Sequence, residues 1–233
     1  MARNSTPAFD LLGTGIYTVP EAARMTNVAA ARIRRWLRGY PYTSGGKKHE
    51  QPPVFKHGLP EIDGTLALGF LDLLEIRFID GFLRLGVKWP KLRVLHRAAV
   101  DLVGDNHPFC AQLFKTDGKT IAAKVSKEVD APVIMDLANN QQMFSTVVDP
   151  YFRGVTFHDG TAVEWWPLGE GRSVVLNPRR RFGLPIIARR GIPTATLVRA
   201  YRAEQSVQAI SRWMDVTEKE VADAVAYENT LAA

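Results

Sequence analysis

The chain has 233 residues, which suffices for one large domain or two small ones. Hydrophobic residues make up 46% and charged residues 23%, so the composition excludes a globally disordered protein. Thirty basic and 24 acidic side chains give a formal net charge of +6, a balance that favours an anionic partner. The single cysteine, Cys110, excludes an intramolecular disulfide framework and indicates a reducing compartment.

The sequence has no pattern of a secretory signal or a membrane span. The first ten residues have no apolar run behind a basic start, and the most apolar stretch, 66–87, holds five charged side chains. We therefore expect a cytoplasmic protein with no membrane partner. Residues 1–106 hold 15 basic and 10 acidic side chains, against 15 and 14 in residues 107–233. The first half is thus the part expected to contact an anion.

Residues 18–38 have the pattern of a helix-turn-helix. Thr18 and Glu21 have the spacing of a capping box, so a short helix is predicted that ends near residue 27. A second helix is predicted over 29–37, because its apolar residues recur at spacings of three and four. Two short helices across a tight turn, the second rich in arginine, are typical of a DNA-binding helix-turn-helix.

A basic wing and two longer helices are predicted next. Residues 39–60 are rich in Gly, Pro and Lys, which indicates two short strands around a basic tip at 44–48. The apolar residues of 66–85 fall at spacings of three and four and predict a strong helix. Another helix is predicted from residue 89 to about residue 104.

The second helix and the wing supply the candidate DNA contacts. Arginine can fork onto guanine edges or grip phosphates, and lysines on a wing can hold flanking phosphates. The alternative is a solvated basic helix end beside a flexible loop, but the placement of the charges favours DNA. The candidate DNA-binding residues are Thr18, Arg32, Arg34, Arg35, Arg38, Lys47, Lys48 and Lys56.

Residues 107–176 are predicted to form a small β-rich segment. The pair Asp117-Gly118 between apolar stretches predicts a hairpin over 109–125. Other short elements are expected in this segment: a helix over 132–139 and strands over 143–148, 155–157, 162–166 and 174–176.

The last fifty or so residues are predicted to be helical again. Helices over 194–204, 206–213 and 217–230 would form a bundle similar to a helix-turn-helix. The predicted fold is therefore α+β. The predicted domains are a winged helix-turn-helix over 1–106, the β-rich middle segment over 107–176 and a helical bundle over 177–233.

Two parts of the sequence resemble known families, the first at the amino end. The stretches 16–23, 33–36, 74–79 and 83–87 resemble a MerR-type winged helix-turn-helix, including the Arg-Phe-Ile and Arg-Leu-Gly patterns of the helix after the wing. The resemblance implies binding to duplex DNA. MerR regulators usually continue into a long dimerisation helix and an effector site. This chain is predicted to turn to β structure instead, so metal or drug sensing is not implied.

The second resemblance covers residues 177–228. This stretch looks like a small domain of unknown function that is common in bacterial VapB-type antitoxins, through the patterns at 183–187, 190–194 and 221–227. Together the two ends resemble a VapB-type antitoxin with a MerR-like amino-terminal domain. Such antitoxins pair with PIN-like ribonuclease toxins and usually repress their own operon, so the resemblance implies both partners. A homodimer is expected, because two recognition helices could then read a palindromic operator.

The arginines of the carboxyl end are candidates for toxin neutralisation. PIN-type nucleases hold a divalent metal with acidic side chains, so a cationic group that enters the pocket would displace the ion. The alternative is that these arginines cap a hairpin or contact DNA. The candidate toxin-binding residues are Arg179, Arg180, Arg181, Arg189 and Arg190.

No pattern of an enzyme, cofactor or metal site is present in the sequence. It contains no phosphate-binding loop, no His-Glu-x-x-His and no Gly-x-Ser-x-Gly. His107 and Cys110 are close but lack a second pair, so Cys110 is expected in the core and not at a metal. Two rival functions stay open. One is a stand-alone transcriptional regulator with a ligand-sensing middle segment, and the other is an adaptor whose arginines meet an acidic protein surface.

Overall fold

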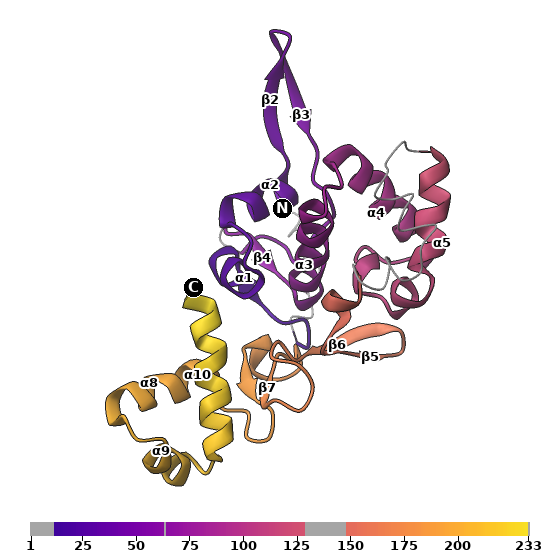
Figure 1. Ribbon diagram of the computed structural model, residues 1–233. Coiled ribbons are helices and arrows are strands. Elements are labelled where there is room, and N and C mark those ends of the chain that lie inside the picture. The colour runs from indigo at the N-terminus through magenta and orange to yellow at the C-terminus, as the bar shows by residue number, and fades with distance from the viewer. Residues whose placement is uncertain (1–11, 63, 129–147, 233) are drawn as a thin grey trace, which may run out of the picture.

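The computed structural model describes residues 12–62, 64–128 and 148–232 (Figure 1). It combines helices with four two-stranded sheets, so the predicted α+β class is confirmed. The helices are α1 (Val19–Thr26), α2 (Ala30–Arg38), α3 (Phe70–Arg84), α4 (Trp89–Val103), α5 (Gln112–Glu128), α8 (Thr194–Glu204), α9 (Val207–Met214) and α10 (Glu218–Ala232), with 3-10 turns η1 (Pro108–Cys110) and η2 (Arg181–Gly183). The strands are β1 (Tyr17–Thr18), β2 (Tyr40–Ser44), β3 (Lys47–Gln51), β4 (Ala67–Leu68), β5 (Val155–His158), β6 (Thr161–Trp165), β7 (Val174–Val175) and β8 (Ile186–Ile187).

The amino-terminal helices begin and end where the capping residues predict. Thr18 is the N-cap of α1 and forms the complete capping box with Glu21, and Asn27 ends the helix in the left-handed region. Helix α2 follows after a tight turn. Gly39 then turns the chain into β2 at a positive φ, where an added Cβ would collide with the carbonyl of Gln51.

The antiparallel pair β2 and β3 forms the predicted wing. It projects from the body of the protein at the top of Figure 1. Gly45 and Gly46 both have positive φ at its tip, as a two-residue hairpin turn requires. Every residue of β2 and β3 is exposed except the half-buried Gln51, so the hairpin is covered on neither face.

Helix α3 is the centre of the fold. Its apolar residues point in several directions and are buried against α1, α4 and η1. Three carboxylates, Asp72, Glu75 and Asp80, are buried on the same helix. One cluster of buried hydrophobic residues continues from Tyr17 through α3 to Tyr227 near the chain's end. The predicted domain boundaries at 106/107 and 176/177 stay predictions.

The predicted hairpin over 109–125 is wrong, because this stretch forms η1 and then α5. The buried residues Phe114, Gly118 and Ala122 lie four apart, which is the spacing of a helix face and not of a strand. Packing against α4 overrides the local turn preference of Asp117-Gly118. The middle segment is therefore mixed helix and strand and not β-rich throughout.

The later elements of the middle segment agree better with the sequence. β5 and β6 form a hairpin, and β7 pairs with β8. The predicted helix over 132–139 and nearly all of the predicted strand over 143–148 lie outside the described residues. Val148 is described, and it lies in a helical turn over 148–152, so the strand prediction is wrong at this residue.

The carboxyl-terminal helices α8, α9 and α10 lie where the sequence predicts them. They are docked to the amino-terminal part by the segment around η2. The backbone N–H of Ile16 donates to the carbonyl of Phe182 at 3.0 Å, and the Tyr17 hydroxyl donates to the carbonyl of Gly183 at 2.8 Å. These two bonds join the first described strand to the last third of the chain.

Replacing Tyr17 with Phe is expected to lower the free energy of unfolding by about 1–2 kcal/mol, because the buried Gly183 carbonyl loses its donor. Urea titration followed by circular dichroism measures the loss. Tyr42→Phe, on the exposed hairpin, is the matched control and should leave stability unchanged. Equal stabilities for Tyr17→Phe and the wild type would contradict the role given to this bond.

Candidate functional site

The outer face of α2 carries four exposed arginines. Ile33, Trp36 and Leu37 are buried on its inner face, so the remaining positions of the helix point away from the core. This arrangement exposes the four predicted DNA-binding arginines of the helix, which are Arg32, Arg34, Arg35 and Arg38. The exposure follows from the amphipathic pattern of the helix.

Three of these arginines have partners inside the protein. Arg32 donates to the buried carboxylate of Asp80 at 3.0 Å, and Arg38 donates to Glu61 at 2.8 Å. The guanidinium of Arg35 lies 5.4 Å from the ring centre of Tyr40. For Arg34, no ion pair is found among the described residues. Among the described residues, Arg34 and Arg35 thus have no acidic partner, and Arg34 has no aromatic contact either.

The hairpin brings further basic residues to the same side. Lys47 and Lys48 are exposed at its tip, and Lys56 is exposed on the segment that follows. The rings of Tyr42 and His49 stack across the two strands with their centres 5.2 Å apart. An isolated two-stranded hairpin is marginally stable in water, so this cross-strand pair helps to hold its shape.

Thr18, the eighth predicted DNA-binding residue, lies at the start of α1. Its hydroxyl donates to the Glu21 carboxylate at 2.7 Å and accepts from the Glu21 backbone N–H at 3.3 Å. The structure therefore gives Thr18 a capping role, and it lies on a different helix from the arginines.

Two arginines of α4 were missed by the sequence analysis. Arg93 and Arg97 line, together with Arg32 and Arg35, a hollow of about 510 Å³ between α2, α4 and the base of the hairpin. Arg93 also donates to the carbonyls of Pro52 and Pro53, which fixes the hairpin's base to α4. The sequence feature that could have revealed these two arginines is their spacing of four residues, which places both on one side of a helix.

The five predicted toxin-binding arginines differ in their contacts, and their role stays a prediction. Arg180 donates to the carbonyl of Ala188 at 2.6 Å. Arg189 donates to both carboxylate oxygens of Glu220, and Arg190 forms an ion pair with Asp215. The Arg189 contact is also the largest cause that lowers the pKa of the Glu220 carboxyl. Arg179 and Arg181 are exposed.

A different set of arginines lines a hollow at the carboxyl-terminal helices. Arg24 of α1 and Arg199 and Arg202 of α8 border a space of about 460 Å³, whose one acidic lining residue is Glu228. No ion pair of these three arginines is found within the described parts of the chain. Arg199 and Arg202 are three residues apart, the spacing that could have revealed them as one helix face.

A network of buried ionisable groups surrounds α3. Asp72 accepts hydrogen bonds from His107 Nε2 at 2.7 Å and from the backbone N–H groups of Gly58 and Gly69. Glu75 lies beside His96, at 3.0 Å, and accepts from the Cys110 thiol at 3.1 Å. Cys110 is buried, as predicted, and burial raises its pKa well above the usual value.

His107 is the cation of this network. Burial by itself would lower the pKa of His107, but its hydrogen bonds with Asp105 and Asp72 outweigh that effect and raise the pKa to about 10. His107 is therefore charged at neutral pH. The sequence feature that could have revealed this network is the presence of carboxylates among the apolar residues of α3, because buried acids need partners.

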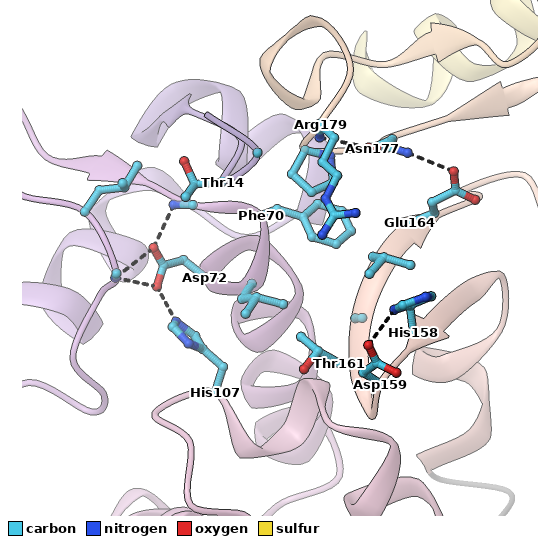
Figure 2. Close-up of a pocket in the computed structure, with 18 residues that line it drawn as sticks. Thr14, Phe70, Asp72, His107, His158, Asp159, Thr161, Glu164, Asn177 and Arg179 are labelled. Atoms are coloured by element: carbon cyan, nitrogen blue, oxygen red, sulfur yellow. Dashed lines mark hydrogen bonds and ion pairs between the residues drawn. The ribbon is translucent and has the colours of Figure 1, made fainter. Parts of the chain in front are cut away.

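An open cavity of about 500 Å³ lies where the amino-terminal and carboxyl-terminal parts meet (Figure 2). Its walls come from segments far apart in the sequence, which are 13–14, 58–59, 69–72, His107, 158–164 and 177–179. The Arg179 side chain extends into this cavity beside Phe70, Glu164 lies next to Asn177, and Asp159 lies near His158.

Two further features concern the whole described part of the chain. None of its helices combines the length and apolar character needed to cross a bilayer. Within residues 12–62, 64–128 and 148–232, no three His, Cys, Asp or Glu side chains are grouped so that they could hold a metal ion.

Replacing His107 with Gln is expected to lower the free energy of unfolding by about 3 kcal/mol at pH 6, because Asp72 loses its buried cation. Because the pKa of His107 is raised, its stabilisation is complete below pH 6.5 and is lost as the pH rises to about 10. Urea titrations should therefore show the difference between the two proteins shrinking across this range. His158→Gln, an exposed neighbour of Asp159, is the control. A difference that does not change with pH would refute this assignment.

Comparison with known proteins gives three similarities. Residues 174–227 match the family described as "Protein of unknown function (DUF433)". A protein of Mycobacterium tuberculosis strain H37Rv described as "Putative antitoxin VapB45" is 26% identical over 221 residues, which are 90% of this chain and 92% of that protein. The crystal structure of Rv2018 from Mycobacterium tuberculosis has a similar fold, with a TM-score of 0.70 and 24% identity over 90% of this chain and 96% of that one. The chain is thus similar along most of its length to a protein named as a VapB antitoxin. The family match over 174–227 includes nearly all of the stretch 177–228, which was predicted to resemble an antitoxin-associated domain.

Proposed function

We propose that this protein is an antitoxin of a toxin–antitoxin pair that binds duplex DNA through α2 and the β2–β3 hairpin. The antitoxin role is supported by the likeness to a protein named as a VapB antitoxin over 90% of the chain. The DNA-binding role depends on one observation, the exposed arginine face of α2 beside an uncovered basic hairpin. In this proposal the amino-terminal part acts as a MerR-like winged helix-turn-helix and represses the protein's own operon.

The α2 face is suited to a major groove. An α-helix fits that groove, and arginine can donate two hydrogen bonds to a guanine edge. The ion pair of Arg32 with buried Asp80 restricts its side chain, so Arg32 can support a phosphate contact in a fixed direction. Arg34 has no described internal partner and is assigned to base contact.

The hairpin and α4 would hold the flanking backbone. Lys47 and Lys48 at the tip and Arg93 and Arg97 beside the base of the hairpin provide positive charge on both sides of α2. Two copies of the chain would present two α2 helices to successive major grooves, which is why we propose a homodimer on a palindromic operator.

Replacing Arg34 with Ala is expected to weaken binding to the DNA upstream of the protein's own gene by about 10- to 100-fold, the range for losing one bidentate base contact. Fluorescence anisotropy with a labelled duplex measures the dissociation constant. Lys47→Ala together with Lys48→Ala should lower the slope of log affinity against log salt by about 2, because two phosphate contacts disappear. Arg153→Ala, an exposed arginine beside β5, is the control. Unchanged binding by the Arg34 variant would remove α2 from the proposed interface.

The second proposed partner is a PIN-like ribonuclease toxin. Arg179 and Arg181 are exposed and form no ion pair with another described residue, so these two of the five candidate arginines are best placed to enter an acidic pocket. Arg180, Arg189 and Arg190 contribute indirectly, since their bonds to Ala188, Glu220 and Asp215 shape the same region.

Replacing Arg179, Arg180 and Arg181 with Ala is expected to abolish inhibition of the ribonuclease encoded beside this protein, because the cations that displace its metal are lost. The readout is RNA cleavage at increasing antitoxin concentration. The double variant Arg179→Ala, Arg181→Ala keeps the Arg180–Ala188 bond and separates loss of contact from loss of fold. Arg199→Ala with Arg202→Ala tests the other basic hollow. Full inhibition by the triple variant would exclude these arginines from neutralisation.

A second candidate function is a stand-alone regulator that senses a ligand. The observation that favours it is the open cavity between the helix-turn-helix and the segment 158–179. A stable complex between this protein and a ribonuclease would favour the antitoxin function over the stand-alone regulator.

A further inference from the structure

The cavity of Figure 2 has the size and position of a small-molecule site. Its volume of about 500 Å³ lies within the range of ligand pockets, and it lies between parts of the chain that are distant in sequence. None of its polar lining residues except Arg179 belongs to the predicted DNA-binding or toxin-binding sets. DNA binding and toxin binding therefore do not explain why the cavity is present.

Most of the charges around the cavity are already compensated. Asp72 accepts hydrogen bonds from His107 and from two backbone N–H groups. Asp159 lies 3.0 Å from His158 and its side chain is 92% exposed, so water solvates its charge. Neither carboxylate needs a bound molecule to satisfy it.

Two opposite charges remain. No acidic side chain lies within ion-pair distance of Arg179 in the described structure. Glu164 accepts one hydrogen bond, from the Asn177 side-chain amide at 2.9 Å, and forms no ion pair with a described cation. Arg179 and Glu164 line the same cavity on either side of Asn177 and form no ion pair with each other. Opposite charges that share a cavity but do not touch can be joined by a molecule that carries both signs.

The surface between the two charges is largely apolar. Phe70 lies beside the Arg179 guanidinium in Figure 2. Leu71 and Val163 also line the cavity. The stem of Arg179 crosses Gly13, where an added Cβ would lie 3.4 Å from Arg179 Cγ, so glycine gives this side chain room to reach the cavity.

We propose that this cavity binds a small zwitterion of the amino-acid type, with its carboxylate on Arg179, its ammonium on Glu164 and its apolar body on Phe70 and Val163. Arginine binds a carboxylate through two parallel N–H donors, and the Glu164 carboxylate accepts from an ammonium. The bound molecule bridges the start of α3 at Phe70 and the segments that carry Glu164 and Arg179, so binding stabilises the docking of these parts.

The test uses the full-length protein and defined probes. Each standard L-amino acid, β-alanine and γ-aminobutyrate is added at a saturating concentration, and the thermal unfolding midpoint Tm is measured. At least one probe is expected to raise Tm by about 4 °C or more. The amide of that probe, which lacks the carboxylate, and its N-acetyl form, which lacks the ammonium, are expected to have no effect.

Variants then assign the effect to the two side chains. Arg179→Met keeps the apolar stem, and Glu164→Gln keeps an acceptor for Asn177, so both preserve the local packing. Each is expected to weaken binding of the active probe at least tenfold by isothermal titration calorimetry, with a native circular dichroism spectrum. Arg153→Met and Glu170→Gln, exposed and outside the cavity, are the matched controls and should bind as the wild type does.

Three results would overturn the proposal. They are the absence of any Tm increase across the probe set, an increase that survives in either Arg179→Met or Glu164→Gln, and equal binding of the amide or N-acetyl derivative. Arg179 is also a candidate toxin-binding residue, so the Arg179→Met variant bears on toxin binding as well. The Glu164→Gln variant and the probe derivatives test the cavity alone, because Glu164 is assigned to neither DNA nor toxin binding.

Discussion

The arrangement of the amino-terminal half depends on three carboxylates buried on one helix. Asp72, Glu75 and Asp80 of α3 are almost completely shielded from water. A buried carboxylate is costly unless it is hydrogen-bonded or paired, so each must be met by a donor from another element. His107 after α4, His96 of α4 and Arg32 of α2 meet them in turn. The acids of α3 thus specify where α2, α4 and η1 can pack.

This constraint extends to the proposed DNA-binding surface. The bond from Arg32 to Asp80 fixes the rotation of α2 relative to the core, and the buried Ile33 and Trp36 act in the same direction. A rotation of α2 would break an ion pair whose acidic member is 6% exposed, and it would also uncover apolar surface. The direction in which Arg34 points is therefore a property of the core as much as of the helix itself.

Local patterns predict the parts of this fold that depend on local contacts. The Thr18–Glu21 capping box predicts the start of α1, and the burial of Ile33 and Leu37 follows from their spacing in α2. The hairpin predicted over 109–125 is wrong, because the turn preference of Asp117-Gly118 gives way to packing against α4, a contact between elements that no local window contains.

The same difference between local and non-local contacts decides which parts of the candidate sites could be predicted. Exposure of the α2 arginines could be predicted, since it is the complement of the buried face. The pairing of Arg32 with Asp80, 48 residues away, and of Arg189 with Glu220 could not, because nothing local joins these positions. The cavity is assembled from segments between residues 13 and 179, and its opposing charges become visible only when those segments are placed in space.

The two hydrogen bonds between residues 16–17 and the segment around η2 have a consequence for folding during synthesis. The Ile16 backbone N–H and the Tyr17 hydroxyl donate to the carbonyls of residues 182 and 183, so neither donor has its native acceptor until about three quarters of the chain has left the ribosome. At ordinary translation speeds this delay is on the order of 10–30 s. A nascent or truncated chain would carry the amino-terminal helices with these two donors unpaired. The amino-terminal part therefore gains its last native hydrogen bonds only late in synthesis.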